Sequence, residues 1–176
     1  MAIRILLAVP TEECLNLLHS LLDEALHLIC FDLATTEVRT RQALLDRVDA
    51  GLMSEAEAVD VVLVDWDLAE EATPDLVREL LMRNPRLRVI TLLPHHLRQY
   101  RELVWEAGAC NSMPKEHMDQ EWLSSILCVM FRAMQREAKL RAELQSQQGA
   151  VSLPPLGEAE PTCQPAHSIA PQPNQL

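Results

Sequence analysis

The sequence "DVVLVDWDL", Asp60–Leu68, places two carboxylates, Asp65 and Asp67, directly after four consecutive aliphatic residues. An uninterrupted aliphatic run of this length is typical of a strand that is buried on both faces of a parallel sheet. The runs "IRILLAV" at 3–9 and "RVITLL" at 88–93 have the same character. Together they predict the inner strands of one sheet, and Asp65 falls at the carboxyl end of a strand, where such sheets carry their reactive groups.

Helical patterns lie between these strands. The segment "EECLNLLHSLLDEAL" at 12–26 carries leucines at helical spacing, and "TPDLVRELLMRN" at 73–84 predicts a helix with Thr73 as N-cap and a proline in the first helical position. Two further helices are expected to end at Gly51 and Gly108. The alternation gives about five β-α units and predicts an α/β fold with helices on both sides of an open parallel sheet.

The C-terminal part of the chain changes character twice. The segment 122–148 is helical in pattern, first apolar and then mostly charged with Leu140 and Leu144 persisting, so a long helix is expected to extend beyond the domain. From residue 149 the chain holds six of its eleven prolines and neither Lys nor Arg, a composition that does not support a packed core. The predicted organisation is a folded domain at 1–133, a helical extension at 134–148 and a disordered tail at 149–176.

Composition excludes several classes of partner and compartment. The formal net charge of −11 disfavours nucleic acid as a partner, since such binding depends on clustered Lys and Arg. No apolar stretch approaches the length of a membrane span, and the N-terminus does not resemble a signal peptide, so we expect no membrane association and a cytoplasmic location. The five cysteines are scattered without a C-x-x-C pair, which favours reduced thiols over disulfides or zinc.

Four segments resemble the receiver domain of bacterial response regulators, the flavodoxin-like family of two-component phosphorelay signalling. They are "IRILLAVPTEECLNLLHSLL", "DVVLVDWDL", "NPRLRVITLLPHH" and "EAGACNSMPKE", and the resemblance covers roughly residues 2–133. It implies a doubly wound, five-stranded parallel sheet, Asp65 as the phosphoacceptor and Lys115 as the lysine that contacts the phosphoryl oxygens. Lys115 is informative because the chain has only two lysines beside thirteen arginines.

Other positions depart from the family pattern. The acidic pair that holds Mg²⁺, the hydroxyl of the fourth strand and the aromatic residue of the fifth strand are matched, in order, by Val9 with Pro10, Leu93 and Ser112. Glu12 and Glu13 are candidate replacement metal ligands, although the first turn of a helix also favours acidic residues through the helix dipole. Mg²⁺ is therefore expected only if the phosphoacceptor site works, and no other cofactor is expected.

Three functions remain open at this point. The preferred one is a stand-alone, non-enzymatic pseudo-receiver that signals through protein–protein contacts, with an impaired site and a homodimer through its last helix, because phosphotransfer without a neutralising metal should be slow. The second is a functional response regulator that a histidine kinase phosphorylates on Asp65. The third is a flavodoxin-like domain that binds a small molecule, which the lack of a Gly-rich phosphate loop disfavours.

Overall fold

The computed structural model describes residues 2–150, with side chains described as far as residue 147. Five parallel strands form one sheet in the order β2-β1-β3-β4-β5. The strands are β1 (Ile3–Ala8), β2 (Leu33–Val38), β3 (Val61–Asp65), β4 (Arg88–Leu93) and β5 (Asn111–Pro114). This is the doubly wound, flavodoxin-like order, so the predicted fold class is confirmed. In sheets of this order the ligand site lies beside the carboxyl ends of β1 and β3.

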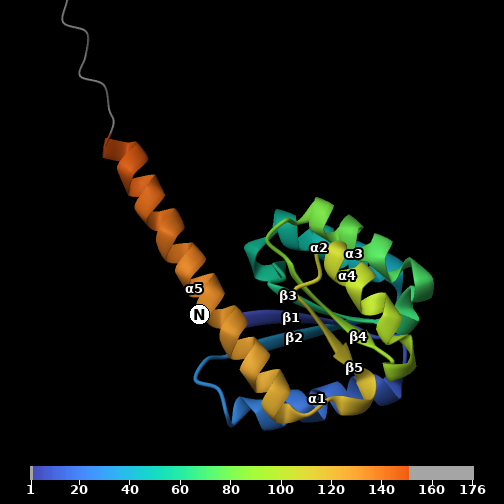
Figure 1. Ribbon diagram of the computed structural model, residues 1–176. Helices are drawn as coiled ribbons and strands as arrows, with labels where there is room; N and C mark the ends of the chain where they lie inside the picture. Colours follow the sequence, from blue (N-terminus) through green and yellow to red (C-terminus); the bar gives the residue numbers. More distant parts are fainter. Residues whose placement is uncertain (1, 151–176) are drawn as a thin grey trace, which may run out of the picture. The chain divides into compact units, whose positions relative to one another are not determined.

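Helices cover both faces of the sheet (Figure 1). They are α1 (Glu12–Leu26), α2 (Arg41–Met53), α3 (Thr73–Arg83), α4 (Arg101–Glu106) and α5 (Gln120–Ala150). Buried side chains of α1 and α5 form one core with one face of the sheet, while α2, α3 and α4 form a second core on the other face. Residues of β3 contribute alternately to the two cores, which explains its uninterrupted aliphatic sequence.

Two helix boundaries on the second face involve residues that the sequence singled out. Helix α3 begins at Thr73 itself, so Ala72 occupies the N-cap and the predicted capping role of Thr73 is wrong. The Thr73 hydroxyl instead lies 3.5 Å from the carbonyl oxygen of Trp66. Helix α4 is followed by Gly108 at φ +105°, as expected for a glycine that terminates a helix, and it is preceded by a 3₁₀ segment, His95–Tyr100.

Gly51 has a different role from the predicted one. Helix α2 continues two residues beyond it, to Met53, so Gly51 does not end the helix. A Cβ atom at this position would lie 2.8 Å from the carbonyl oxygen of Glu57, in the short 3₁₀ segment Glu55–Glu57 that follows. The glycine therefore allows the segment after α2 to pass close to the helix.

The long C-terminal helix expected from the sequence is present as α5. The compact unit that contains the sheet ends at Arg136, inside this helix. Of the predicted disordered tail, only residues 149 and 150 are described, as the last residues of α5, and the rest lies outside the described residues. The predicted division into domain, extension and tail therefore remains a prediction.

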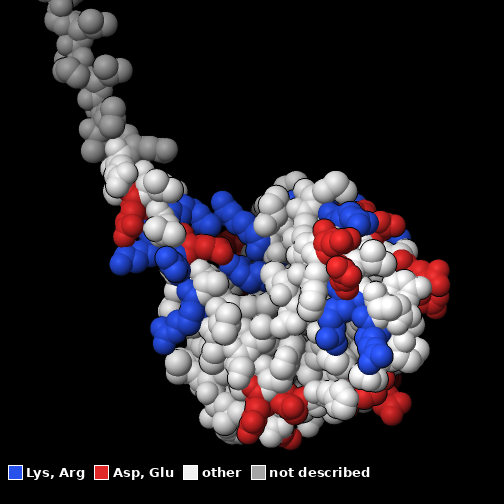
Figure 2. Space-filling model, in the orientation of Figure 1, with Lys and Arg blue, Asp and Glu red and all other residues white. Residues whose placement is uncertain are grey.

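Charged side chains of both signs lie next to one another at the right of the view in Figure 2. Ion pairs join α2 to α3, where Glu79 lies 2.9 Å from Arg41 and 3.0 Å from Arg83. These bonds lower the pKa of the Glu79 carboxyl. No helix within residues 2–150 is both long enough and apolar enough to cross a bilayer.

Candidate functional site

Asp65 ends β3 and is completely buried. Its position follows from the register of the central strands, because β3 pairs with β1 on one side and β4 on the other, and all three run in the same direction. The chain then turns into a 3₁₀ segment, Trp66–Leu68, and the Asp65 Oδ1 accepts a hydrogen bond from the backbone N–H of Asp67 at 3.0 Å. A buried carboxylate needs more than one such donor, and the rest comes from the segment after β5.

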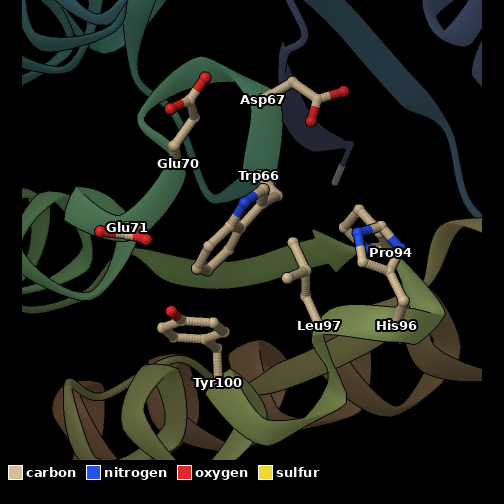
Figure 3. A pocket seen from close by; sticks show the side chains of 8 residues that line it. All are labelled: Trp66, Asp67, Glu70, Glu71, Pro94, His96, Leu97 and Tyr100. Carbon is tan, nitrogen blue, oxygen red and sulfur yellow. The ribbon is translucent and has the colours of Figure 1, made fainter.

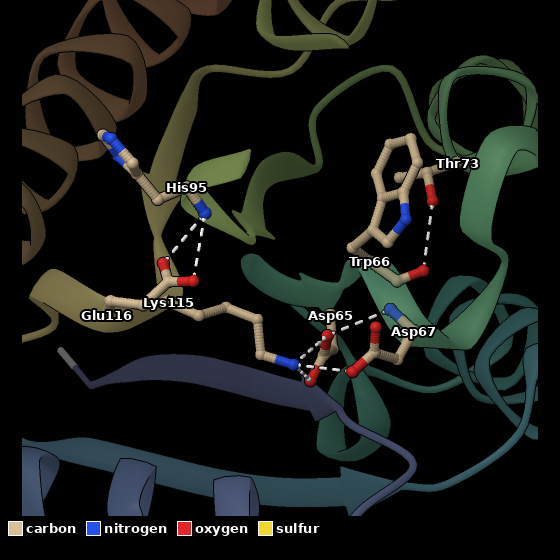
Figure 4. A network of polar contacts seen from close by, with 7 residues as sticks. All are labelled: Asp65, Trp66, Asp67, Thr73, His95, Lys115 and Glu116. Atoms are coloured by element: carbon tan, nitrogen blue, oxygen red, sulfur yellow. Dashed lines mark hydrogen bonds and ion pairs between the residues drawn. The ribbon is translucent and has the colours of Figure 1, made fainter. Parts of the chain in front are cut away.

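Lys115 directly follows β5 and supplies the missing charge. Its Nζ donates to both carboxylate oxygens of Asp65 at 2.9 Å and to Oδ2 of Asp67 at 2.8 Å (Figure 4). Burial alone would lower the pKa of Lys115, but the bonds to Asp67 and Asp65 outweigh it and raise the pKa above its ordinary value. The ammonium is therefore charged at neutral pH, and it is shared between two carboxylates.

Glu116 connects the same segment to the loop after β4. Its carboxylate accepts the backbone N–H of His95 at 2.9 and 3.1 Å (Figure 4). Lys115 and Glu116 are neighbours of opposite charge, and each bonds a different loop. The segment after β5 thus fixes the loops that follow both β3 and β4.

The positions at which the sequence departs from the receiver pattern line this edge with apolar or small groups. Val9 follows β1, is completely buried, and its backbone N–H bonds the Val38 carbonyl at 3.0 Å. Leu93 at the end of β4 is also buried, and the buried Ser112 hydroxyl has no hydrogen-bond partner within the described residues. None of these side chains supplies an oxygen to the Asp65 carboxylate or to a cation beside it.

The two candidate replacement ligands have different surroundings. Glu12 is exposed and lies 3.7 Å from Arg39. Glu13 lines a cavity of about 580 Å³ together with Thr11, Cys14, Leu17, Asp67, Lys115 and Met118. In the part of the chain that the structure describes, no three His, Cys, Asp or Glu side chains are grouped so that they could hold a metal ion. The donor set expected for Mg²⁺ is thus not assembled, and both glutamates remain predictions as ligands.

Sequence reasoning missed two features of this region. Cys14 is buried beside the site, and burial, reinforced by the charge of Asp65, raises the pKa of its thiol to about 11. Trp66 is only 4% exposed, and its indole packs against Tyr100 with ring centroids 4.8 Å apart. No sequence pattern indicates this ring contact, because Tyr100 lies beyond the next strand.

Comparison with known proteins gives matches at the level of structure. No protein-family model and no curated protein matches the sequence. A response regulator receiver domain protein from Clostridium thermocellum superposes with a TM-score of 0.61 at 20% identity, covering 78% of this chain and 98% of that one. A CheY-like receiver domain protein from Methanospirillum hungatei gives 0.58 at 15% identity, covering 77% and 99%. NtrX from Brucella abortus gives 0.66 at 16% identity, covering 85% of this chain and 30% of the other.

These similarities concern the whole sheet and its helices, since two of the three matched chains are covered almost completely. Identities of 20% or less leave the roles of individual residues to be argued from their own geometry. The strand order, the buried aspartate that ends β3 and the lysine that follows β5 agree with the expected resemblance. The chain has the fold of response regulator receiver domains.

Proposed function

We propose that this chain is a receiver-like signalling protein that works through protein–protein contacts and that Asp65 is a poor phosphoacceptor. The observation that carries the proposal is the state of the Asp65 carboxylate. It is completely buried, both of its oxygens are bonded to Lys115, and the neighbouring strand end presents Val9 and Pro10 in place of acidic ligands. The aspartate is thus neutralised by a residue of its own chain.

Phosphoryl transfer to a carboxylate brings two anions together, and its catalysis is mainly electrostatic stabilisation by positive charge. Lys115 is the positive group here, and it already serves two carboxylates, so Asp65, Asp67 and Lys115 carry a combined charge of −1. A phosphoryl group arriving at this site meets no unshared positive charge. The partner of such a protein is a signalling protein that binds a surface whose conformation does not depend on phosphorylation of Asp65.

A ligand titration that follows the fluorescence of a single tryptophan tests this proposal. Trp105→Phe with Trp122→Phe leaves Trp66, which adjoins Asp65, as the only indole in the chain. We expect its fluorescence to stay flat when Mg²⁺ and then beryllofluoride, a phosphoryl mimic, are added. A saturable change that disappears in Asp65→Asn would overturn the proposal. It would favour a functional response regulator phosphorylated by a histidine kinase, with Glu13 as a metal ligand in the cavity that it shares with Lys115.

A gain-of-function variant makes a flat result informative. Pro10→Asp returns one carboxylate to the end of β1, at a half-buried position where a polar side chain can reach solvent. If the absent carboxylate is what prevents metal binding, this variant responds to Mg²⁺ and the parent does not. A matched control is Pro85→Asp, which adds the same charge at an exposed position away from the site.

The proposal includes self-association through α5. Beyond Arg136, Leu140 and Leu144 are 50% and 60% exposed, and they lie four residues apart, on one side of the helix. Two apolar positions give about one heptad of seam, which supports a weak dimer. Leu140→Gln with Leu144→Gln is expected to shift a concentration-dependent dimer to monomer in analytical ultracentrifugation. A parent chain that is monomeric at all concentrations would contradict this part.

A further inference from the structure

A second cavity lies between the loops that follow β3 and β4, outside the Asp65 site. Its volume is about 230 Å³, and we call it the aromatic pocket (Figure 3). Its lining residues are Trp66, Asp67, Glu70, Glu71, Pro94, His96, Leu97 and Tyr100. The volume is several times the roughly 30 Å³ that one water molecule occupies in the liquid, so it has room for a side-chain head group.

The inner part of the aromatic pocket is formed by two rings. Trp66 comes from the loop after β3 and Tyr100 from the loop after β4, and their planes are inclined at 48°. Trp66 is buried and Tyr100 is half-buried, so the Tyr100 ring is the more accessible of the two. Aromatic faces carry partial negative charge and attract cations, with tryptophan the strongest of the natural rings.

The rim of the aromatic pocket carries two carboxylates that form no bond within the described part of the chain. Glu70 and Glu71 are exposed, and neither carboxylate has a hydrogen bond or an ion pair with another residue of the described part of the chain. In Figure 3 both lie on one side of the two rings, with Pro94 and His96 on the other side. Among the described residues, no Lys or Arg lines the pocket. The rings and the rim therefore select for positive charge.

We propose that the aromatic pocket binds an arginine side chain of a partner protein. A guanidinium is planar, so it can lie against a ring, and its N–H groups form a fork that matches carboxylate oxygens. A lysine ammonium would satisfy the charge, but it has neither the planar face nor the fork of N–H donors. The carboxylates at the mouth are exposed, so a side chain can enter from outside. This binding does not require a phosphoryl group on Asp65.

Peptides that differ in one head group test the proposal. The probes are the capped tripeptides Gly-Arg-Gly, Gly-Lys-Gly and Gly-citrulline-Gly, and the readout is the NMR shift of the Trp66 indole N–H in the full chain, assigned by its loss in Trp66→Phe. We expect a saturable shift with the arginine peptide, weaker binding of the lysine peptide and none with citrulline, which keeps the shape of arginine without its charge. Equal shifts with arginine and citrulline, or no saturable shift with arginine, would overturn the proposal.

Matched charge variants test the rim. Glu70→Gln with Glu71→Gln removes two carboxylates from the aromatic pocket and keeps their shape. It should weaken binding of the arginine peptide by about twofold to tenfold, because solvent screens the ion pairs of exposed carboxylates. Glu102→Gln with Glu106→Gln makes the same change in net charge at two exposed positions of α4 that do not line the pocket. Equal weakening by both pairs would reduce the effect to long-range charge and refute the site.

Discussion

Replacing Lys115 by Met removes the charge that neutralises Asp65 while keeping a side chain of similar length. The Asp65 carboxylate is completely buried and the Lys115 side chain is 19% exposed. After the substitution Asp65 keeps the hydrogen bond from the Asp67 backbone N–H and its interaction with the neutral Cys14 thiol. The variant therefore leaves a buried carboxylate without the counter-charge of Lys115.

The magnitude follows from this burial. Breaking a buried ion pair by removing one partner costs about 3–5 kcal/mol. The lower end applies here, about 3 kcal/mol, because Lys115 is partly exposed and one hydrogen bond to Asp65 remains. Asp65→Asn should cost less, about 1 kcal/mol, since the amide oxygen still accepts from Lys115 and the lysine keeps its bond to Asp67.

Urea unfolding followed by far-UV circular dichroism measures these costs at neutral pH. Neutral pH is suitable because the raised pKa of Lys115 keeps its contribution fully present below the unfolded value of about 10.4, and the contribution is lost only as the pH rises through the folded value. Lys139→Met is the matched control. Lys139 is the only other lysine, it is 80% exposed, and its pair with Glu143 spans 4.0 Å, so the change should stay within about 0.5 kcal/mol.

The double variant Lys115→Met with Asp65→Asn decides whether the pair is coupled. Without the buried negative charge, loss of the lysine should cost much less, and the two single costs should exceed the double cost by about 2 kcal/mol. Additivity within about 0.5 kcal/mol would refute the reasoning, because it would mean that Asp65 does not depend on Lys115 for its charge balance.

Three further predictions concern packing around the sheet. Gly108→Ala should destabilise the fold by at least about 1 kcal/mol in urea unfolding, because residue 108 has φ +105° and a new Cβ would lie 2.5 Å from Leu81 Cδ1; a neutral effect would contradict this. Gly51→Ala should also destabilise by the same assay, by about 1 kcal/mol or more, since its Cβ would lie 2.8 Å from a backbone carbonyl, whereas an unchanged midpoint would show that the following segment yields. The Cys14 thiol, with its pKa raised to about 11 by burial and by Asp65, should react with iodoacetamide in the folded chain far more slowly near neutral pH than the exposed cysteines, and faster as the pH approaches 11; equal labelling in mass spectrometry would refute it.

The fold could be predicted because burial on both faces leaves a direct trace in the sequence. Every residue of β3 is buried, so the strand has no polar position before Asp65. The helix boundaries were harder to predict from the sequence, since they depend on contacts between different segments. Thr73 is the first residue of α3, and its hydroxyl lies near the Trp66 carbonyl. Gly51 leaves room for the segment that follows its own helix. Local preference alone assigned both to helix ends.

The candidate site could be predicted in part for a related reason. Asp65 ends β3 and Lys115 follows β5, with β4 between these two strands. All three strands are parallel, so their carboxyl ends lie at the same edge of the sheet whatever the loops do. The environment of Glu12 depends instead on Arg39, which follows β2, and the burial of Trp66 depends on Tyr100, which follows β4. Pairings between loops have no periodicity in the sequence, so only the structure reveals them.

The bonds of Lys115 and Glu116 link the Asp65 site to the aromatic pocket. Lys115 holds the loop after β3, Glu116 holds the loop after β4, and these two loops form the walls of the pocket. The pocket's geometry therefore depends on the ion pair between Asp67, which lines the pocket, and Lys115, which does not. In Lys115→Met the freed Asp67 carboxylate adds little attraction, because it is 47% exposed and solvent screens it, whereas loss of the bond releases one wall. Binding of an arginine side chain should consequently weaken, and by linkage the bound arginine should stabilise the parent chain more than the variant.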